Sequence, residues 1–317
     1  MPAGDLSPRP LGSSGMDVSA LALGSWRTFE RLPPETGVAI LRAARDEGIT
    51  FFDDARYNDE TGRAPIPTGW SEVLFGRLFR RAGWQRDEVI VSNKLWWEFW
   101  PDQSAAAELD GSLERMGFDH IDVIYANPPE HGLPLDELVG SVTDLITAGK
   151  ARAWAIVNWP AALLAEAAAI CTRTGVPMPC AAQLPYSVVQ RTPVESPAMR
   201  SALAACGAPV VASYVLAGGV LTGKYDADPG AGRAAGTLDD PRVVQARQSA
   251  GAVVALAGRF GVSPATVAVA FALLEPSVAS VLFGATRPAQ VADNAAALEL
   301  VARLTPADAA ELRALGS

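Results

Sequence analysis

Short apolar runs of strand length alternate with longer amphipathic stretches along most of the chain. An apolar run between turn residues is typical of a buried strand, and apolar residues three to four positions apart are typical of a helix. The alternation therefore predicts strands that are each followed by a helix. The predicted strands are 18–23, 49–52, 88–92, 121–126, 151–157, 180–184, 209–213 and 280–283. The predicted helices are 34–47, 71–82, 102–116, 135–146, 160–174, 197–206, 242–260, 266–275, 288–298 and one that begins at Thr305.

This order of elements favours an α/β fold, a closed parallel (β/α)8 TIM barrel forming a single domain over residues 1–317. Extra helices lie near the C-terminus, and residues 1–10 are expected to be a flexible extension. The rival fold is a doubly wound open sheet. It would prefer a Gly-x-Gly-x-x-Gly turn after an early strand, and the sequence has none. A Gly-rich segment at 216–236 interrupts the alternation and is predicted to be a long loop between barrel elements.

The composition of the chain limits its partners. Of 317 residues, 49% are apolar and 19% are charged, so a large core can form. No apolar run approaches the roughly 20 residues that a membrane-spanning helix needs, and no export signal is recognisable. The net charge of −9 disfavours nucleic acid and membranes as partners. Three cysteines (Cys171, Cys180 and Cys206) without metal-ligand spacing indicate a cytoplasmic compartment and no metal site. The oligomeric state stays open.

Polar side chains stand at the end of every predicted strand. The second strand ends in Asp53 and Asp54, with Tyr57 close behind, and the third delivers Lys94. In a barrel the carboxyl ends of the strands converge on one face, where the chemistry takes place. A carboxylate, an ammonium and a phenol together would tune the tyrosine, whose pKa is normally ~10, into a proton donor near neutral pH. Without further matches, Asp53 and Lys94 could equally be a structural ion pair.

From about residue 11 to its C-terminus the chain resembles the aldo-keto reductases, barrel enzymes that use a nicotinamide cofactor without a Rossmann motif. The first matches to the family are its Asp-Thr-Ala segment at Asp53-Asp54-Ala55, its strand-end lysine at Lys94, and its Gly-Lys-x-Arg segment leading to Ser-Asn at 149–152 and Asn158. Further along are its carboxamide-binding glutamine at Gln183 with the aromatic Tyr186, its pyrophosphate loop at 216–225, and its adenosine-phosphate site at 284–288 with Gln290 and Asn294.

The resemblance implies an NADP-dependent oxidoreductase that reduces an aldehyde or ketone. Tyr57 would give a proton to the carbonyl oxygen while the nicotinamide gives hydride to its carbon, and Lys94, paired with Asp53, would lower the tyrosine pKa. Arg287 would meet the 2′-phosphate, which favours NADPH over NADH. The implied cofactor-binding residues are Gly24, Ser25, Trp26, Asp53, Asn158, Gln183, Tyr214, Leu216, Gly218, Lys224, Gly284, Thr286, Arg287, Gln290 and Asn294.

Two departures from the family concern the proposed acid–base residues. Asn127 stands at the fourth strand end, where the family usually has a histidine. Its amide can donate a hydrogen bond to a carbonyl oxygen but cannot carry a proton. Only Arg56 separates Ala55 from Tyr57, one residue fewer than in the family, which could turn the phenol elsewhere. Beside it, Asp54 replaces a small residue. If the two carboxylates lie close together, one of them is expected to hold a raised pKa.

Two further departures concern the cofactor. Val157 replaces a serine that binds the carboxamide, so one hydrogen bond is lost. Ser213-Tyr214 inverts the usual order, which leaves open which ring stacks on the nicotinamide. Changes around one site indicate altered chemistry or a tuned substrate.

An aromatic-rich loop, Leu-Trp-Trp-Glu-Phe-Trp, follows Lys94 and has neither helical nor strand period. We expect Trp96 and Trp97, with Trp26 and Trp159, to form a flat-walled pocket for a bulky aromatic, polycyclic or sugar-type carbonyl. A hydrophobic lid or a dimer contact is the alternative for this loop.

Two other functions remain open at this stage. One is altered chemistry on the same scaffold, such as double-bond reduction, dehydration or isomerisation. The other is a cofactor-binding regulatory protein with little turnover, as some members of the family are. Both alternatives rest on Asn127, which stands in place of the histidine and cannot carry a proton.

Overall fold

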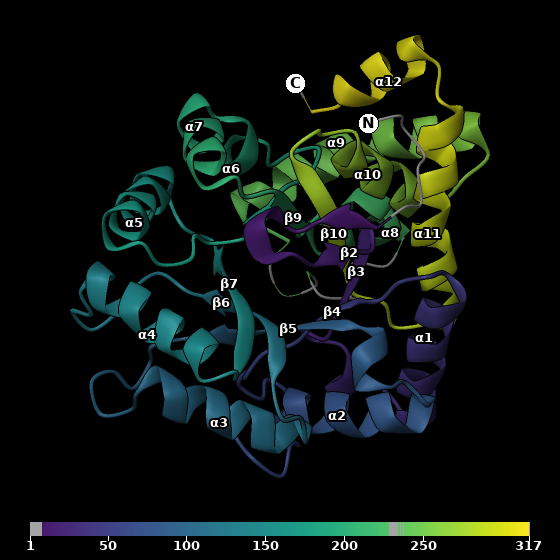
Figure 1. The fold of residues 1–317 in the computed structure, drawn as a ribbon. Helices are drawn as coiled ribbons and strands as arrows, with labels where there is room; N and C mark the ends of the chain where they lie inside the picture. The colour runs from purple at the N-terminus through teal and green to yellow at the C-terminus, as the bar shows by residue number, and fades with distance from the viewer. Residues whose placement is uncertain (1–7, 228–233, 235, 237, 317) are drawn as a thin grey trace.

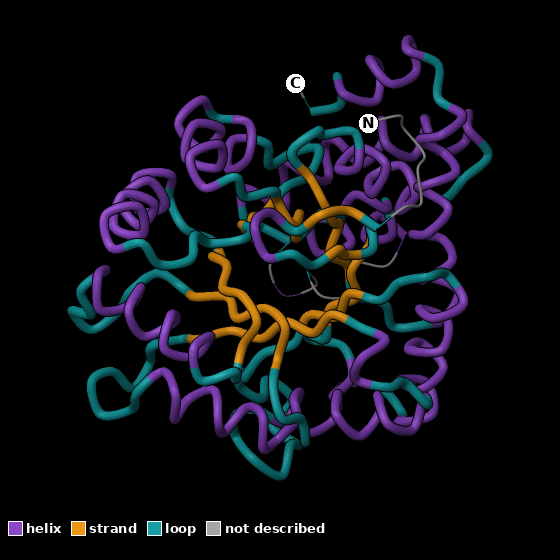
Figure 2. Tube along the Cα trace, viewed as in Figure 1, coloured by secondary structure: helices purple, strands orange, loops and turns teal. Residues whose placement is uncertain are grey.

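Eight parallel strands close into a barrel in the order β10, β3, β4, β5, β6, β7, β8, β9, so that β10 pairs with both β3 and β9. The strands are β3 Leu21–Gly24, β4 Phe51–Asp53, β5 Ile90–Leu95, β6 Ile121–Ala126, β7 Ala151–Val157, β8 Ala182–Pro185, β9 Val210–Ser213 and β10 Val278–Phe283. The computed structural model describes residues 8–227, 234, 236 and 238–316. Figures 1 and 2 show the strands as a central ring with the helices around it. The prediction of a (β/α)8 barrel is confirmed.

The strands are apolar on both faces because each is covered on both. All six residues of β6 are buried. Val123 and Tyr125 belong to the cluster inside the barrel, whereas Ile124 and Ala126 belong to the cluster under the outer helices. A parallel strand buried in this way reads as a nearly continuous apolar run, interrupted in β6 by Asp122 alone, which is why its bounds were predicted correctly.

Helices surround the barrel and cover its outer face (Figure 1). They are α1 Pro34–Asp46, α2 Trp70–Ala82, α3 Ala105–Met116, α4 Leu135–Thr147, α5 Ala161–Thr174, α6 Thr192–Glu195, α7 Pro197–Cys206, α8 Lys224–Ala227, α9 Pro241–Phe260, α10 Pro264–Leu273, α11 Pro288–Arg303 and α12 Pro306–Arg313. The short 3-10 helices are η1 Gly12–Ser14, η2 Phe29–Arg31, η3 Arg86–Glu88 and η4 Ala217–Thr222.

An antiparallel hairpin of β1 (Arg9–Pro10) and β2 (Asp17–Val18) lies over the N-terminal end of the barrel. Leu11 is fully buried and packs with the interior cluster. Gly12 has φ +55°, and a Cβ atom there would lie 2.3 Å from the carbonyl oxygen of Cys180. The hairpin therefore closes the barrel at this end and leaves the other end for chemistry.

Three predictions about the ends and loops need correction. Residues 1–7 of the expected flexible extension lie outside the described residues, but Arg9–Pro10 is a paired strand. The predicted strand 18–23 is divided between the hairpin and the barrel, because the chain crosses from one to the other there. The segment 216–236 is not simply a long loop, since it contains η4 and α8; residues 228–233 and 235 lie outside the described residues.

The third barrel strand begins later than expected. The prediction was 88–92, whereas β5 spans Ile90–Leu95. Residues 86–88 instead form η3, and the backbone N–H of Gln85 donates to the Glu88 side chain at 2.9 Å. The shift places Lys94 inside the strand rather than in the loop after it, and this fixes the direction of its side chain.

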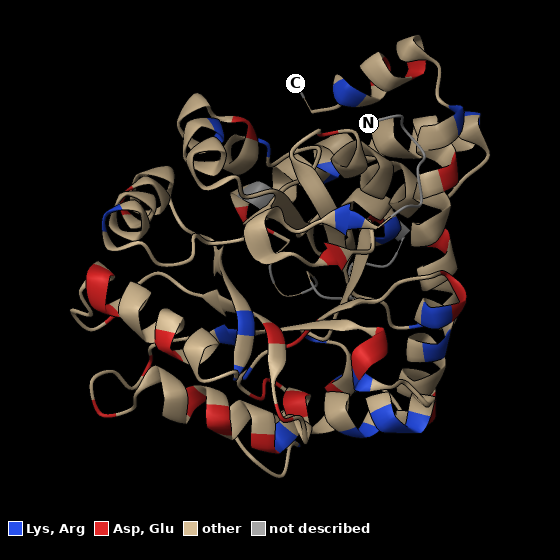
Figure 3. Cartoon of the chain, in the orientation of Figure 1, with Lys and Arg blue, Asp and Glu red and all other residues tan. Residues whose placement is uncertain are grey.

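Charged residues fall mostly on the outer helices, as the colouring of Figure 3 shows. No single helix among the described residues is long and apolar enough to span a membrane. Val243–Phe260 and Pro264–Leu273 pass such a test only together, and they are bent by 97°. Within the described ranges, no group of three or more His, Cys, Asp and Glu side chains is placed to hold a metal ion.

Candidate active site

Backbone hydrogen bonds hold the chain together just beyond the C-terminal ends of the strands. The N–H of Ser25 donates to the Asp53 carbonyl at 3.0 Å, and the N–H of Asp54 donates to that of Ser92 at 3.1 Å. On the other side of the barrel, the N–H of Asn158 donates to the carbonyl of Gln183 at 3.0 Å. The residues that follow the strands are therefore positioned almost as rigidly as the strands themselves.

Asp53 is the centre of the polar cluster at this end. It is 3% exposed. Its Oδ2 accepts a hydrogen bond from Lys94 Nζ at 2.6 Å, and its Oδ1 accepts from Ser92 Oγ at 2.8 Å and Gln183 Nε2 at 3.2 Å. A buried carboxylate needs such compensation, and three hydrogen-bond donors, one of which is the Lys94 ammonium, supply it.

Lys94 links Asp53 to the tyrosine. Its ammonium donates to Asp53, to Tyr57 Oη at 3.2 Å and to the Asp54 carbonyl at 3.4 Å. Burial disfavours the charged ammonium, but the Asp53 carboxylate and Tyr57 outweigh that cost, so the pKa of Lys94 lies above its usual value. Lys94 is therefore a cation at neutral pH, and it keeps the Tyr57 oxygen in place as an acceptor.

Tyr57 reaches this cluster although the loop is one residue short of the family pattern. The N–H of Tyr57 donates to the carbonyl of Ala55, two residues earlier, at 2.8 Å. An i→i+2 bond of this kind defines a γ-turn, the tightest turn available. The turn compensates for the missing residue, and the ring packs edge-on against Trp96 with centroids 6.0 Å apart.

The expected lowering of the tyrosine pKa is not found. Burial raises the pKa of Tyr57 above its usual value, and Asp53 and Asp54 raise it further, while Lys94 lowers it only in part. The Lys94 ammonium is bound closely to the Asp53 carboxylate, and this negative charge reduces the stabilisation that Lys94 can give a Tyr57 phenolate. Tyr57 is therefore a fully protonated phenol across the physiological range.

Asp54 lies next to Asp53 but in a different environment. It is fully buried, and its Oδ1 accepts a short hydrogen bond from Ser25 Oγ. Its Oδ2 is buried and has no hydrogen-bond partner in the part of the chain that the structure describes. Burial, and secondarily the charge of Glu72, raise the pKa of Asp54 to about 8. The expectation that one of the two acids holds a raised pKa therefore applies to Asp54.

Asn127 is half-buried at the end of β6. Its side-chain Nδ2 donates to the Leu95 backbone carbonyl at 2.9 Å, and its backbone carbonyl accepts from Trp97 Nε1 at 3.0 Å. An amide nitrogen carries two hydrogens, so one remains for a ligand. In the structure Asn127 thus ties the β5 and β6 ends together.

The expected nicotinamide-side residues lie on neighbouring strand ends. Asn158 is exposed and has φ +59°, a left-handed conformation that asparagine tolerates better than most residues. Gln183 is 4% exposed, and its amide donates to Asp53. Gly24 is buried at the end of β3, beside the Ser25–Asp54 pair. Val157 points into the interior cluster, as befits an apolar residue in place of a serine.

The residues expected around the pyrophosphate gather at η4. Gly218 and Gly219 have φ +69° and +88°. A Cβ atom on Gly219 would lie 2.8 Å from Lys224 Nζ, and one on Gly218 would lie 3.5 Å from the Tyr214 hydroxyl. Tyr214 is 41% exposed, and Leu216 caps the start of η4. This segment therefore brings backbone, an ammonium and an exposed phenol to one place.

The residues expected at the adenosine phosphate surround the start of α11. The side chain of Gln290 accepts from the N–H of Thr286 at 2.7 Å and of Arg287 at 3.2 Å. Arg287 is exposed, and Gly284 precedes this turn. Asn294 is 2% exposed, and its Oδ1 has no hydrogen-bond partner among the described residues. An orphaned buried acceptor of this kind fits a ligand that brings a donor.

Only part of the expected tryptophan pocket is open. Trp26 is 38% exposed and Trp96 is half-buried. Trp97 and Trp159 are each 2% exposed, and Trp159 Nε1 donates to the Ala126 carbonyl at 2.9 Å. These two indoles hold the loops in place rather than forming exposed walls. Trp159 does border an apolar groove of about 540 Å³ beside Asn158.

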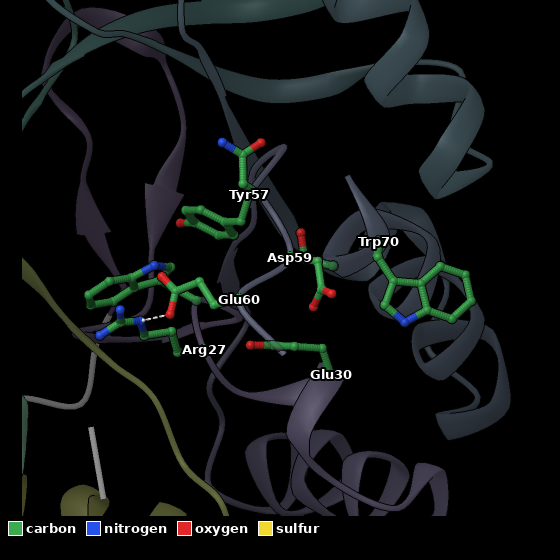
Figure 4. Close-up of a pocket in the computed structure, with 9 residues that line it drawn as sticks. Arg27, Glu30, Tyr57, Asp59, Glu60 and Trp70 are labelled. Carbon is green, nitrogen blue, oxygen red and sulfur yellow. Dashed lines mark ion pairs between the residues drawn. The ribbon is translucent and has the colours of Figure 1, made fainter. Parts of the chain in front are cut away.

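A small polar crevice lies beside Tyr57. Figure 4 shows it between Tyr57 and the ion pair of Arg27 and Glu60, whose Nε and Oε2 are 2.6 Å apart. Glu30 and Asp59 also line it. Its volume of about 20 Å³ is room for little more than one water molecule, so it is not a substrate pocket.

Two residues that support the aromatic loop were not foreseen from the sequence. Glu108 is 5% exposed and accepts from the N–H of Trp96 at 2.8 Å. Arg56 is 7% exposed and donates to Glu98 at 2.8 Å and Thr68 at 3.1 Å. A glutamate on the apolar face of a predicted helix was the available signal for the first. Arg56 offered no signal beyond its place between Ala55 and Tyr57.

Eight parallel strands closed into a barrel, with a buried polar cluster at their C-terminal ends, form the architecture of a barrel enzyme. Residues 20–317 match the model of the Aldo/keto reductase family. The chain belongs to this family.

Several relatives extend the comparison over nearly the full chain. A protein of Oryza sativa subsp. japonica described as a probable voltage-gated potassium channel subunit beta is 32% identical over 311 residues, covering 93% of this chain and 92% of the relative. An Arabidopsis thaliana protein with the same description is 30% identical over 311 residues, with the same coverage. A putative subunit of this kind from Schizosaccharomyces pombe is 31% identical over 318 residues, covering 94% and 90%.

Proposed function

We propose that this protein is an NADPH-dependent carbonyl reductase. The observation that carries the proposal is the chain of contacts from Asp53 through Lys94 Nζ to Tyr57 Oη, with distances of 2.6 and 3.2 Å, at the end of the barrel where such enzymes act. Membership of the Aldo/keto reductase family supports an oxidoreductase, and this cluster supports carbonyl reduction as its chemistry.

The residues present fit a dinucleotide. The exposed Arg287 at the N-terminus of α11 would hold the 2′-phosphate, because a helix N-terminus and a guanidinium both favour an anion. Asn294 Oδ1, which lacks a partner in the described structure, would accept from the adenine amine. Gly218, Gly219 and Lys224 would border the pyrophosphate, with Leu216 and Tyr214 beside them. Asn158 and Gln183 would hold the carboxamide.

Tyr57 would act as the general acid. The cofactor, when bound, supplies the hydride. Lys94 donates to the Tyr57 oxygen, so the phenol proton remains directed toward a substrate carbonyl oxygen. The alkoxide that develops there is far more basic than a phenolate, so even a phenol with a raised pKa can protonate it. The remaining hydrogen of Asn127 would orient the same oxygen.

The substrate is proposed to be a bulky aromatic, polycyclic or sugar-type carbonyl. Trp26 and Trp96 offer aromatic faces beside Tyr57, and the groove beside Asn158 could take an apolar body. We further propose a cytoplasmic protein, since its three cysteines are free and buried. No nucleic acid or membrane partner is proposed.

NADPH consumption with a panel of aldehydes and ketones tests the proposal. We expect oxidation of NADPH that depends on the carbonyl compound, together with formation of the matching alcohol. Tight binding of NADPH without consumption by any compound would contradict it. Reduction of an enone at its double bond rather than its carbonyl would instead support the altered chemistry that Asn127 leaves open.

A second candidate is a cofactor-binding regulatory subunit. It is favoured by the relatives described as potassium channel beta subunits and by Asn127 in place of an acid–base histidine. NADPH bound tightly with negligible turnover, and a change in a partner protein that depends on the bound cofactor, would favour this role.

A further inference from the structure

Two consecutive acids at the end of β4 lie in opposite electrostatic environments. Asp53 has an ammonium and two further side-chain donors. Asp54 is equally inaccessible, but its side chain accepts from neutral donors, the Ser25 hydroxyl and the Ala55 backbone N–H, and its Oδ2 has no partner in the described part of the chain. Nothing in the family pattern requires an acid there, since a small residue is usual.

The cations near Asp54 are engaged by other carboxylates. From β5, Lys94 contacts the Asp54 carbonyl at 3.4 Å, but its ammonium is bound to Asp53 at 2.6 Å. From α2, Glu72 faces Asp54 as a second negative charge. Glu72 is itself bound to Arg115 of α3 at 2.5 Å and to Asn93 at 2.8 Å. Asp54 is thus a buried acid without a cation of its own, which favours its neutral form.

The hydroxyl that binds Asp54 belongs to the segment where the cofactor is expected. Ser25 follows β3 directly and lies between Gly24 and Trp26, and its backbone N–H is bound to the Asp53 carbonyl at 3.0 Å. Asp54 therefore touches both the cofactor-facing segment and the residues around Tyr57. A charge that appears on it would act on both.

We propose that Asp54 is a positioning residue whose proton sets the preference of the site between the two redox states of the cofactor. As a neutral acid it holds Ser25 in place. When it ionises, it adds a negative charge near the nicotinamide position. That charge favours the oxidised ring, which is cationic, over the reduced ring, which is neutral. This inference rests on the proposed NADP site.

The ratio of the dissociation constants of NADP+ and NADPH, measured from pH 6.5 to 9.5, tests the inference without any turnover. Both cofactors carry the same 2′-phosphate, so its titration cancels in the ratio. Lys94 and Tyr57, the other close groups of Asp54, have pKa values raised above their usual ones and so stay outside this range. In the wild type we expect the ratio to fall as the pH rises past about 8, on the order of ten-fold if the coupling is one pKa unit.

The Asp54→Asn variant should remove this pH dependence, since the amide keeps a hydrogen-bonding group but cannot ionise. Asp54→Thr, with a small residue of the family type, is a second variant should the amide fail to fold. Asp122→Asn is the matched control: Asp122 is 1% exposed but lies at the start of β6, paired with Arg86 at 2.6 Å and Arg152 at 2.8 Å. This control should retain the wild-type slope.

Linkage supplies an independent readout. If ionised Asp54 favours NADP+, then NADP+ binding must favour ionisation and release protons. Proton release on NADP+ binding near pH 7.5, seen with an indicator dye, should exceed that of Asp54→Asn. Equal slopes and equal proton release in wild type and Asp54→Asn would overturn the inference while leaving the reductase proposal intact. Failure of either cofactor to bind would instead overturn the proposed function.

Discussion

At the scale of single residues, the pKa of Tyr57 depends on which of two partners the Lys94 ammonium binds more closely. Lys94 is bound to Asp53 at 2.6 Å and to Tyr57 at 3.2 Å, so the carboxylate takes the greater share of its charge. Tyr57 consequently remains a phenol with a raised pKa rather than a near-neutral acid. The arrangement suits a group that gives up its proton only when a strongly basic alkoxide forms beside it.

Replacing Tyr57 by phenylalanine removes that proton. We expect kcat/KM for aldehydes to fall roughly 10²–10⁴-fold, the usual contribution of a positioned general acid. NADPH affinity should change little. Tyr125→Phe is the control, because Tyr125 also lies near Lys94, with the ammonium 5.9 Å from its ring centroid, but is fully buried and packs in the cluster inside the barrel. Steady-state kinetics of both variants measure the effect, and full activity in Tyr57→Phe would exclude Tyr57 as the proton donor.

The sequence could predict which residues carry the site but not how they are arranged. Asp53, Lys94 and Tyr57 were identifiable because strand ends converge in a barrel. The γ-turn that brings Tyr57 into place was not, since it depends on a single backbone bond from Tyr57 to Ala55. The raised tyrosine pKa was also missed, because residue types alone do not tell which partner an ammonium prefers.

At the scale of elements, the turn of the N-terminal hairpin requires a glycine for two separate reasons. Gly12 has φ +55°, and a Cβ there would lie 2.3 Å from the Cys180 carbonyl oxygen. Gly15 has φ +71°, but a Cβ at that position would meet no atom within 4 Å. Gly12→Ala should therefore lower the free energy of unfolding by at least about 1 kcal/mol more than Gly15→Ala, which has only the left-handed cost. Denaturant unfolding measures both; equal losses would contradict the close approach.

The aromatic loop after β5 depends on a buried arginine. Arg56 bridges Glu98 at 2.8 Å and Thr68 at 3.1 Å, and its guanidinium lies 5.4 Å from the Phe99 ring centroid. In Arg56→Met we expect KM for bulky carbonyls to rise several-fold while NADPH affinity is unchanged, since the loop that carries Trp96 is loosened. Arg63→Met, at an exposed position, should match the wild type. An unchanged KM in Arg56→Met would show that the loop does not line the substrate site.

Elements that keep the same packing partners along their length were predicted more accurately than those that switch partners. The strand Ile121–Ala126 and the helix Pro197–Cys206 have the predicted bounds. The run 18–23 was misread, because an apolar pattern does not show that the chain leaves a hairpin and enters a barrel. In η4, Gly218 and Gly219 have the non-helical, left-handed backbone that a glycine pair indicates, but the 3-10 turns on either side of them were not predicted.

At the scale of the whole molecule, Asp54 should make stability depend on pH. The unfolded chain loses this proton near its ordinary pKa of 3.8, whereas the folded protein keeps it to about 8. Between these values the folded state binds more protons, so this group makes the protein less stable as the pH rises. Relative to the wild type, the Tm of Asp54→Asn should therefore increase from pH 4.5 to pH 8. A constant Tm difference would show that Asp54 ionises normally in the fold.

The barrel explains why function could be approached from sequence at all. Its eight strands bring residues as distant as Asp53 and Gln183 within 3.2 Å, so a polar residue at each strand end becomes informative. The residues at the strand ends did not allow us to predict which side chains in the surrounding loops are buried. Trp97 and Trp159 were expected to line a pocket. Both indoles are buried and donate to backbone carbonyls, and of the two Trp159 borders the groove beside Asn158.

A structure with NADP+ and an unreactive carbonyl compound bound would show whether Tyr57 is the proton donor. We predict that the carbonyl oxygen lies within about 3.2 Å of Tyr57 Oη, with Lys94 still bound to that phenol and Gln183 turned toward the carboxamide. A carbonyl oxygen held elsewhere, with Tyr57 outside hydrogen-bond reach, would contradict it.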